Sequence, residues 1–106
     1  MRVYISGPIT KDKGYYRKFM NAEIKLKKAG HEVVNPARLG RLFPKSFDTT
    51  DYLACEYPII ERCDAVFFLK GWKESYGARK EYEFALKQEV KLIFEKREVV
   101  LRDGNI

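Results

Sequence analysis

Two glutamates stand two positions apart in the segment GWKESYGARKEYEFALK, residues 71–87, whose later part has the composition of a helix. At about 100° per residue, the small and apolar residues of this helix form one buried stripe, made by Ala78, Tyr82, Ala85 and Leu86. Glu83 falls on the opposite side and precedes Lys87 at the favourable i,i+4 spacing, which is typical of a solvated face. Glu81 borders the stripe between two alanines, so it is either an ordinary boundary glutamate or a carboxylate with open space around it that is available for chemistry.

The first turn of this helix has features that favour an anion. Ser75 is a good N-cap. Gly77 lowers the stability of a helix, which suggests that the backbone there closely approaches another group. Free N–H groups and the helix dipole would favour a phosphate at residues 75–77. Ser75 and Gly77 are therefore candidates for contact with an anion.

The residues that usually bind metals or act as sulfur nucleophiles are sparse. Cys55 and Cys63 lie eight positions apart and His31 is the single histidine, so no zinc pattern is present. A Cys–His nucleophile is not indicated either, because His31 is expected to start a strand. We expect both cysteines to be reduced and partly or fully buried, with no metal and no other cofactor.

Length and composition predict one globular domain over residues 1–106, with 45% hydrophobic and 34% charged residues. The net charge of +6 attracts anions, either nucleic acid or small phosphates. The basic residues are dispersed along the chain, so nucleic acid is the less favoured of these partners. No apolar run approaches the ~20 residues that span a membrane, and the first residues do not form a signal peptide. The expected location is the cytoplasm, without membrane contact.

Strand and helix patterns alternate along the chain. Strands are expected in the segments RVYIS (2–6), HEVVNP (31–36), DAVFFLKG (64–71) and VKLIFE (90–95), and REVVLRDGNI (97–106) could supply a fifth. Helices are expected at residues 15–29, at about 50–62 and at 75–87, with residues 37–50 as a long loop containing at most one helical turn. This order predicts a three-layer, doubly wound (flavodoxin/Rossmann-like) parallel sheet of four to five strands, with helices on both faces.

Helical periodicity also predicts which residues of the first two helices are buried. In the first helix these are Phe19, Ala22, Ile24, Leu26 and Ala29. In the second they are Leu53, Tyr57, Ile60 and Cys63, and Pro58 is expected to kink that helix or to delay its start.

Ligands of doubly wound sheets bind beyond the carboxyl ends of the strands, where the strand order reverses. The loops at this edge are expected at residues 6–13, 35–44 and 70–75. The substrate-binding residues expected in them, besides Ser75, are Gly7, Pro8, Ile9, Asn35, Gly71 and Trp72. The first of these loops contains neither a full GxGxxG nor a Walker lysine pattern, so dinucleotide and P-loop binding are not indicated.

Four stretches together resemble a known family: VYISGPI, VVNP, CDAVFFLKGW and SYGARKEYEFA. They are similar to the nucleoside 2-deoxyribosyltransferase-like superfamily over roughly residues 2–94. The greatest similarity is to its small phage and bacterial branch, which carries the pattern GW-x-x-S-x-G-A-x-x-E and is a domain of unknown function.

The resemblance implies roles for several residues. Glu81 would be the nucleophilic glutamate of the superfamily, oriented by Tyr4. Ser75 would contact the substrate, through its phosphate in the nucleotide hydrolases of the superfamily. Gly7 would belong to the first substrate-binding loop.

The resemblance also points to a general acid. Asp64 matches an aspartate at a strand start, for which a structural role is expected. In the nucleotide hydrolases an acidic residue eight positions before that aspartate assists acid catalysis, and here this position is Glu56. Asp51 is the alternative acid in the same segment.

The implied activity is cleavage or transfer of the N-glycosidic bond of (deoxy)nucleosides or nucleoside 5′-monophosphates through a glycosyl–Glu81 intermediate. Water as second reactant gives a hydrolase and another base gives a transferase. The alternatives are a non-catalytic nucleotide-binding module or phage regulator on the same fold and, third, a nucleic-acid binder. Superfamily members are typically homodimers or larger and complete their sites with a neighbour's residues, so a homo-oligomer is expected. The segment FPKSFDTTDYL, residues 43–53, is a candidate for such a contribution.

Overall fold

The computed structural model describes residues 1–96. Within this range the strands form a four-stranded, all-parallel sheet in the order β2-β1-β3-β4. Their bounds are β1 (Arg2–Ser6), β2 (Glu32–Val34), β3 (Ala65–Phe68) and β4 (Lys91–Phe94). The expected parallel α/β sheet is thereby confirmed, while the proposed fifth strand, 97–106, lies outside the described residues.

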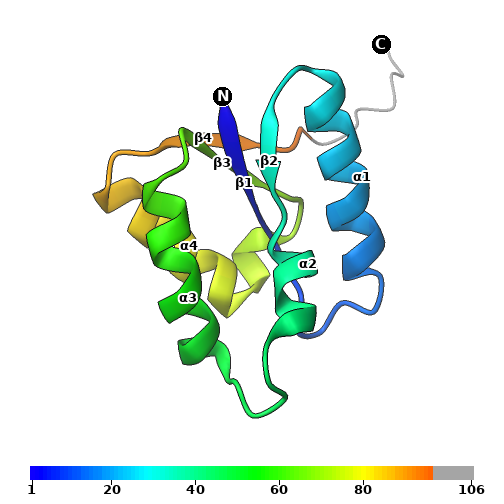
Figure 1. The fold of residues 1–106 in the computed structure, drawn as a ribbon, viewed down its shortest axis with the longest axis vertical. Coiled ribbons are helices and arrows are strands. Elements are labelled where there is room, and N and C mark those ends of the chain that lie inside the picture. Colours follow the sequence, from blue (N-terminus) through cyan, green and yellow to red (C-terminus); the bar gives the residue numbers. More distant parts are fainter. Residues whose placement is uncertain (97–106) are drawn as a thin grey trace.

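Helices cover both faces of the sheet and make the fold three-layered (Figure 1). Their bounds are α1 (Tyr15–Lys28), α2 (Pro36–Leu39), α3 (Thr49–Glu61) and α4 (Tyr76–Lys87), with 3₁₀ turns η1 (Gly40–Leu42) and η2 (Trp72–Glu74). Helices α1 and α2 lie on one face, and α3 and α4 lie on the other. In the described residues no helix is long and apolar enough to cross a membrane.

The central strand β1 contributes to two separate hydrophobic cores, because successive side chains of a strand point to opposite faces. Val3 and Ile5 pack with α1 residues, whereas Tyr4 packs with residues of α3 and α4. The neighbouring β3 alternates in the same way and all four of its residues are buried. Burial on both faces explains why β3 reads as a continuous apolar run.

Several residues that were expected to be buried are exposed. Ile24 and Leu86 are 51% and 55% exposed, and Ala29 and Cys55 are exposed as well. In α1 the buried residues are Phe19, Ala22 and Leu26, as expected, together with Glu23. Glu23 can be buried because Asn35, Lys27 and Arg38 form hydrogen bonds and ion pairs with its carboxylate. The neighbouring Ile24 therefore faces the solvent.

The segment after β2 is more helical than expected. Asn35 accepts the N–H of Ala37 and caps α2, with Pro36 at the first helical position. Helix α3 continues through Pro58, which is exposed, and the carbonyl that loses its partner belongs to the exposed residue Ala54. Water can replace the missing hydrogen bond at such a surface.

Candidate active site

Strand β1 carries two hydroxyl groups into the layer between the sheet and helices α3 and α4. Tyr4 and Ser6 are separated by one residue and therefore point to the same face. The side chain of Tyr4 is fully buried, and Ser6 is 1% exposed. Buried hydroxyl groups need hydrogen-bond partners, so an acceptor is required beside them.

Helix α4 supplies that acceptor. The Ser75 hydroxyl accepts the N–H of Ala78 at 3.2 Å and fixes the helix start, as predicted. Ala78 and Ala85 face the core, and Glu81 between them is 6% exposed. Two small neighbours leave room for the Glu81 side chain against the sheet. Glu83 is exposed and lies 3.6 Å from Lys80, so the two glutamates differ as predicted, although the ion pair is i,i+3.

Both carboxylate oxygens of Glu81 receive a hydroxyl donor from β1. The Tyr4 hydroxyl donates to Oε2 at 2.7 Å, and the Ser6 hydroxyl donates to Oε1 at 2.6 Å. These are short, charge-assisted distances. The two donors fix the position and plane of the carboxylate.

A second carboxyl group adjoins Glu81 from helix α3. Glu56 is 5% exposed and forms part of the inward face of α3. Burial, followed by the charge of Glu81 and a hydrogen bond to it, raises the pKa of Glu56 to about 9. Glu56 is therefore protonated at neutral pH and can donate a proton.

Opposing effects act on Glu81. Burial raises the pKa of Glu81, and the hydrogen bonds from its three partners lower that pKa without cancelling the effect of burial. Burial and the charge of Glu81 raise the pKa of Tyr4 well above its ordinary value, so its hydroxyl remains a donor. Two buried carboxyls in contact do not ionise together, so the pair holds one proton over a wide pH range.

Neither Glu56 nor Glu81 forms a salt bridge within residues 1–96. The same part of the chain contains no group of three or more His, Cys, Asp or Glu placed to hold a metal ion. The site therefore combines an ionisable carboxylate, a protonated carboxyl and two hydroxyl donors. This arrangement is suited to nucleophilic attack combined with proton donation.

The loops after β1 and β3 lie against each other at the carboxyl edge of the sheet. The N–H of Leu69 donates to the carbonyl of Ser6 at 2.8 Å. A Cβ at Gly7 would lie 2.9 Å from Leu69 atoms, so this packing requires glycine there. Gly71 has φ of 83° and adjoins Pro8. These residues thus have structural reasons for their types, beside the predicted substrate contact.

Three other residues predicted to bind substrate are engaged within the protein. The Asn35 amide donates to Glu23 Oε1 at 2.9 Å, on the α1 face of the sheet, and its oxygen caps α2. Ile9 is half-buried and packs against the core under α1. Trp72 packs between Phe68 and Tyr82, with ring centroids 5.0 and 4.9 Å apart.

The start of α4 is open. A Cβ at Gly77 would meet only Thr49 Cγ2, at 3.9 Å, so no described protein group makes the close approach that was expected. Ser75 is half-buried.

The two acidic residues considered beside Glu56 have structural partners. The alternative acid, Asp51, is exposed and forms a capping box with Asp48 at the start of α3. Asp64 accepts the N–H of Arg2 at 2.8 Å. Of the two candidate acids, Glu56 is thus the one placed beside Glu81.

Ser6 was not identified as a functional residue from the sequence. The signal was nevertheless present, because Ser6 stands two positions after Tyr4 on the same strand and therefore shares its face.

The fold and the carboxyl pair define this chain as a three-layer α/β domain with two adjoining buried carboxyl groups next to the carboxyl edge of a parallel sheet. Residues 1–94 match the family model described as a domain of unknown function, DUF4406, and the chain belongs to that family. No curated protein and no solved structure matches the chain significantly. The family description names no reaction, so a function has to be argued from the site.

Proposed function

We propose that this domain cleaves the N-glycosidic bond of (deoxy)nucleosides or their 5′-monophosphates, with Glu81 as the nucleophile. The observation that carries the proposal is the buried carboxyl pair, in which Glu81 receives two hydroxyl donors. Burial and the charge of Glu81 raise the pKa of Glu56, which favours a proton on that residue. Glycosidic reactions that retain configuration use two carboxyl groups in opposite protonation states. The similarity of VYISGPI and SYGARKEYEFA to the nucleoside 2-deoxyribosyltransferase-like superfamily supports the same assignment.

In the proposed first step, an oxygen of Glu81 attacks C1′ of the sugar. The C1′–N bond breaks, its electron pair goes to the base, and Glu56 transfers its proton to the departing base. Each Glu81 oxygen accepts one hydroxyl hydrogen bond, and when Glu56 turns to the base its own hydrogen bond to Glu81 is released, which frees a lone pair for the attack. The products are the free base and a glycosyl ester on Glu81.

The second step removes the sugar from Glu81. Glu56, now a carboxylate, accepts a proton from water, and the oxygen of that water forms the new bond to C1′ while the ester bond breaks. Another base in place of water gives transfer. Tyr4 and Ser6 stabilise the carboxylate that leaves, so they assist the second step directly.

The mechanism requires that the resting contacts of the site change when substrate binds. Glu81 is 6% exposed, so substrate has to displace a group that covers its carboxylate. In this mechanism the displaced group is the Glu56 side chain. It leaves its hydrogen bond with Glu81 and forms one with the base, to which it then transfers its proton.

The low exposure of Glu81 also favours a second candidate, a nucleotide-binding module without catalysis. In that case the carboxyl pair would shape a polar interior and the ligand would bind outside it. The two candidates differ in one observable, the release of free base from a bound nucleotide.

A homo-oligomer is proposed as the working form. Residues 43–53 carry the aromatic cluster of Phe43, Phe47 and Tyr52, with centroids 5.1 to 6.2 Å apart, and the adjacent Leu42 is 79% exposed. A neighbouring copy is the proposed partner of this end of the molecule (Figure 1). Sedimentation of the wild type and of Leu42→Ser tests this, and a wild-type monomer at all concentrations contradicts it.

The activity is tested by incubating the protein with a panel of deoxynucleosides and deoxynucleoside 5′-monophosphates and measuring free base by chromatography. Glu81→Gln is expected to abolish release, and Glu83→Gln, a matched change on the exposed face of the same helix, is expected to leave it intact. Ligand binding without base release over the whole panel would favour the binding module. Equal release by both variants would refute the role of Glu81.

A further inference from the structure

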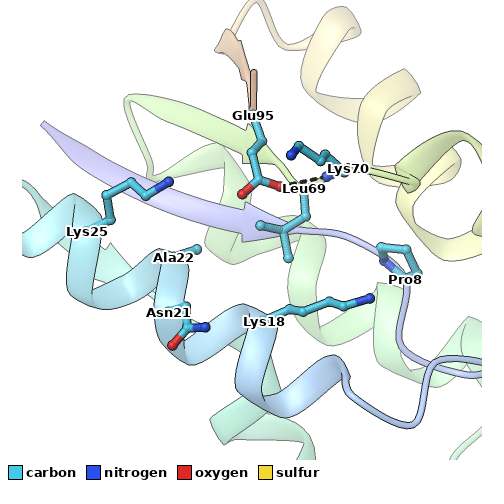
Figure 2. A pocket seen from close by; sticks show the side chains of 8 residues that line it. All are labelled: Pro8, Lys18, Asn21, Ala22, Lys25, Leu69, Lys70 and Glu95. Carbon is cyan, nitrogen blue, oxygen red and sulfur yellow. Dashed lines mark hydrogen bonds between the residues drawn. The ribbon is translucent and has the colours of Figure 1, made fainter. Parts of the chain in front are cut away.

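A hollow of about 270 Å³ lies at the carboxyl edge of the sheet, on the α1 face and thus on the opposite side from Glu81. Its apolar floor contains Leu69 and Ala22, which belong to the core under α1. Pro8, from the loop after β1, forms one wall. Figure 2 shows Leu69 at the centre, between α1 on one side and the ends of β3 and β4 on the other.

The polar lining of this hollow is mainly basic. Lys18 and Lys25 come from α1 and Lys70 follows β3, whereas Glu95 is the single acidic residue in the lining (Figure 2). Glu95 accepts the backbone N–H of Lys70 at 2.9 Å and, among the described residues, makes no salt bridge to a lysine. Lys18 pairs with Asp12 at 2.8 Å.

Lys25 and Lys70 form no salt bridge within residues 1–96. Since Asp12 offsets the charge of Lys18, the charged groups left in the lining are Lys25, Lys70 and Glu95, with a net charge of +1. This positive balance at a concave surface favours an anion. The amide of Asn21 adds a neutral hydrogen-bonding group to the same lining. The charge and the apolar floor together fit a molecule with one anionic end and one apolar part.

The topology points to the same place. β1 is flanked by β2 and β3, and the connections on its two sides run over opposite faces, so the strand order reverses between β1 and β3. Ligands of open α/β sheets bind beyond the carboxyl ends of the strands at this reversal. Pro8 is the second residue after β1, and Leu69 is the first residue after β3. The two loops that flank the reversal therefore contribute Pro8, Leu69 and Lys70 to the hollow, and α1 supplies half of its lining.

We propose that this hollow binds a small phosphorylated molecule, with the phosphate between Lys25 and Lys70 and an apolar part of the ligand on Leu69. The site lies on the other face of the sheet from Glu81. The proposal does not depend on N-glycosidic chemistry, because it concerns binding alone.

The test uses Glu81→Gln as the background, so that no ligand is consumed, and follows amide NMR shifts. The probes are inorganic phosphate, deoxyadenosine 5′-monophosphate and deoxyadenosine. The monophosphate and phosphate are expected to shift the amides of Leu69, Lys70 and Ala22, with weaker binding at higher salt. Deoxyadenosine is expected to bind more weakly than its monophosphate.

Two double variants separate the hollow from the general charge of the protein. Lys25→Gln/Lys70→Gln is expected to weaken binding of the monophosphate about tenfold or more, because it removes both ammonium groups between which the phosphate is placed. Lys28→Gln/Lys87→Gln removes the same charge from exposed positions outside the hollow and is expected to change the affinity by less than about twofold. Equal weakening in both variants overturns the proposal. Shifts confined to residues 75–79, or no shifts with either phosphate probe, also overturn it and leave the base-release test of Glu81 unaffected.

Discussion

Glu23 and Glu81 are equally buried, at 5% and 6% exposure, on opposite faces of one sheet, yet they have opposite surroundings. Glu23 contacts two cations, Lys27 at 2.8 Å and Arg38 at 3.0 Å, and the Asn35 amide. Glu81 contacts two hydroxyl groups and a second carboxyl.

These partners determine whether the buried glutamates are ionised or protonated. Arg38, more than any other neighbour, lowers the pKa of Glu23 to about 2, against the effect of burial. Burial raises the pKa of Glu81, and it raises that of Glu56 to about 9. A buried carboxylate whose oxygens are all paired with cations stays ionised and stabilises the fold. A buried carboxyl pair without cations shares one proton, which can be transferred. The comparison supports, without reference to any relative, the proposal that Glu23 has a structural role and Glu81 a chemical one.

The largest expected effect is a difference in activity between the same substitution at Glu81 and at Glu23. Glu81→Gln removes the nucleophile, and base release is expected to fall by about 10³-fold or more. Glu23→Gln makes the same chemical change at the same burial and is expected to keep most of the activity of the folded protein. The measurement is kcat/KM for free base at a temperature where both variants are folded. A larger loss in Glu23→Gln than in Glu81→Gln would reverse the assignment.

The next effect concerns the proton of the pair. Glu56→Gln cannot donate a proton to the base, and kcat/KM is expected to fall by roughly 10²-fold or more. The wild-type rate is expected to decrease as pH rises towards 9, because Glu56 loses its proton there. This alkaline limb should be missing from the profile of Glu56→Gln. An unchanged limb in that variant would assign the proton to another group.

The stability of the two regions is expected to respond to pH in opposite directions. The folded protein holds a proton on Glu56 that the unfolded chain releases near pH 4.5, so this group lowers the free energy of unfolding as pH rises from about 4.5 to about 9. Glu56→Gln is therefore expected to be more stable than the wild type at pH 7, by up to about 3 kcal/mol.

Glu23 contributes stability that is present above pH 4.5 and is lost as pH falls towards 2. Glu23→Gln is expected to lower the free energy of unfolding by roughly 2 kcal/mol at pH 7, a value reduced by the exposure of the Lys27 and Arg38 side chains. The difference from the wild type should vanish near pH 2. Urea unfolding from pH 2 to pH 9 measures both variants, and parallel pH curves for the two would remove the distinction between the regions.

The smallest predicted effect sharpens the role of Ser6. Ser6→Ala removes one of the two hydroxyl donors to Glu81 and leaves the Tyr4 hydrogen bond in place. The pKa of Glu81 should rise, so the acidic limb of kcat/KM should move to higher pH and the rate at pH 7 should fall about tenfold. Ser6→Thr keeps a hydroxyl and tests recovery. A loss of rate with no movement of the acidic limb would show that Ser6 acts through packing alone.

Periodicity in the sequence was sufficient to predict the parallel α/β fold and to distinguish Glu81 from Glu83. Ser75 as the cap of α4 follows from local backbone chemistry and was equally accessible. These features depend on one element at a time, which is why a single sequence reveals them.

Features that depend on two elements were harder to predict. The buried ion network around Glu23 joins α1, α2 and the cap residue Asn35, and a hydrophobic pattern assigns such polar residues to the surface. The pairing of Ser6 with Glu81 joins residues 75 positions apart. Glu56 was identified by resemblance, because nothing in the α3 sequence alone shows that it faces another carboxyl.

The account depends most directly on the protonation of the buried glutamates, which carbon-13 NMR of labelled glutamate carboxyls measures without any substrate. A titration from pH 2 to pH 10, assigned with Glu56→Gln, Glu81→Gln and Glu23→Gln, is expected to show one carboxyl that remains protonated until about pH 9 and disappears in Glu56→Gln. A second carboxyl should stay ionised down to about pH 2 and disappear in Glu23→Gln. If no glutamate carboxyl titrates above about pH 6, then Glu56 and Glu81 do not share a proton, and the proposed acid and nucleophile are contradicted.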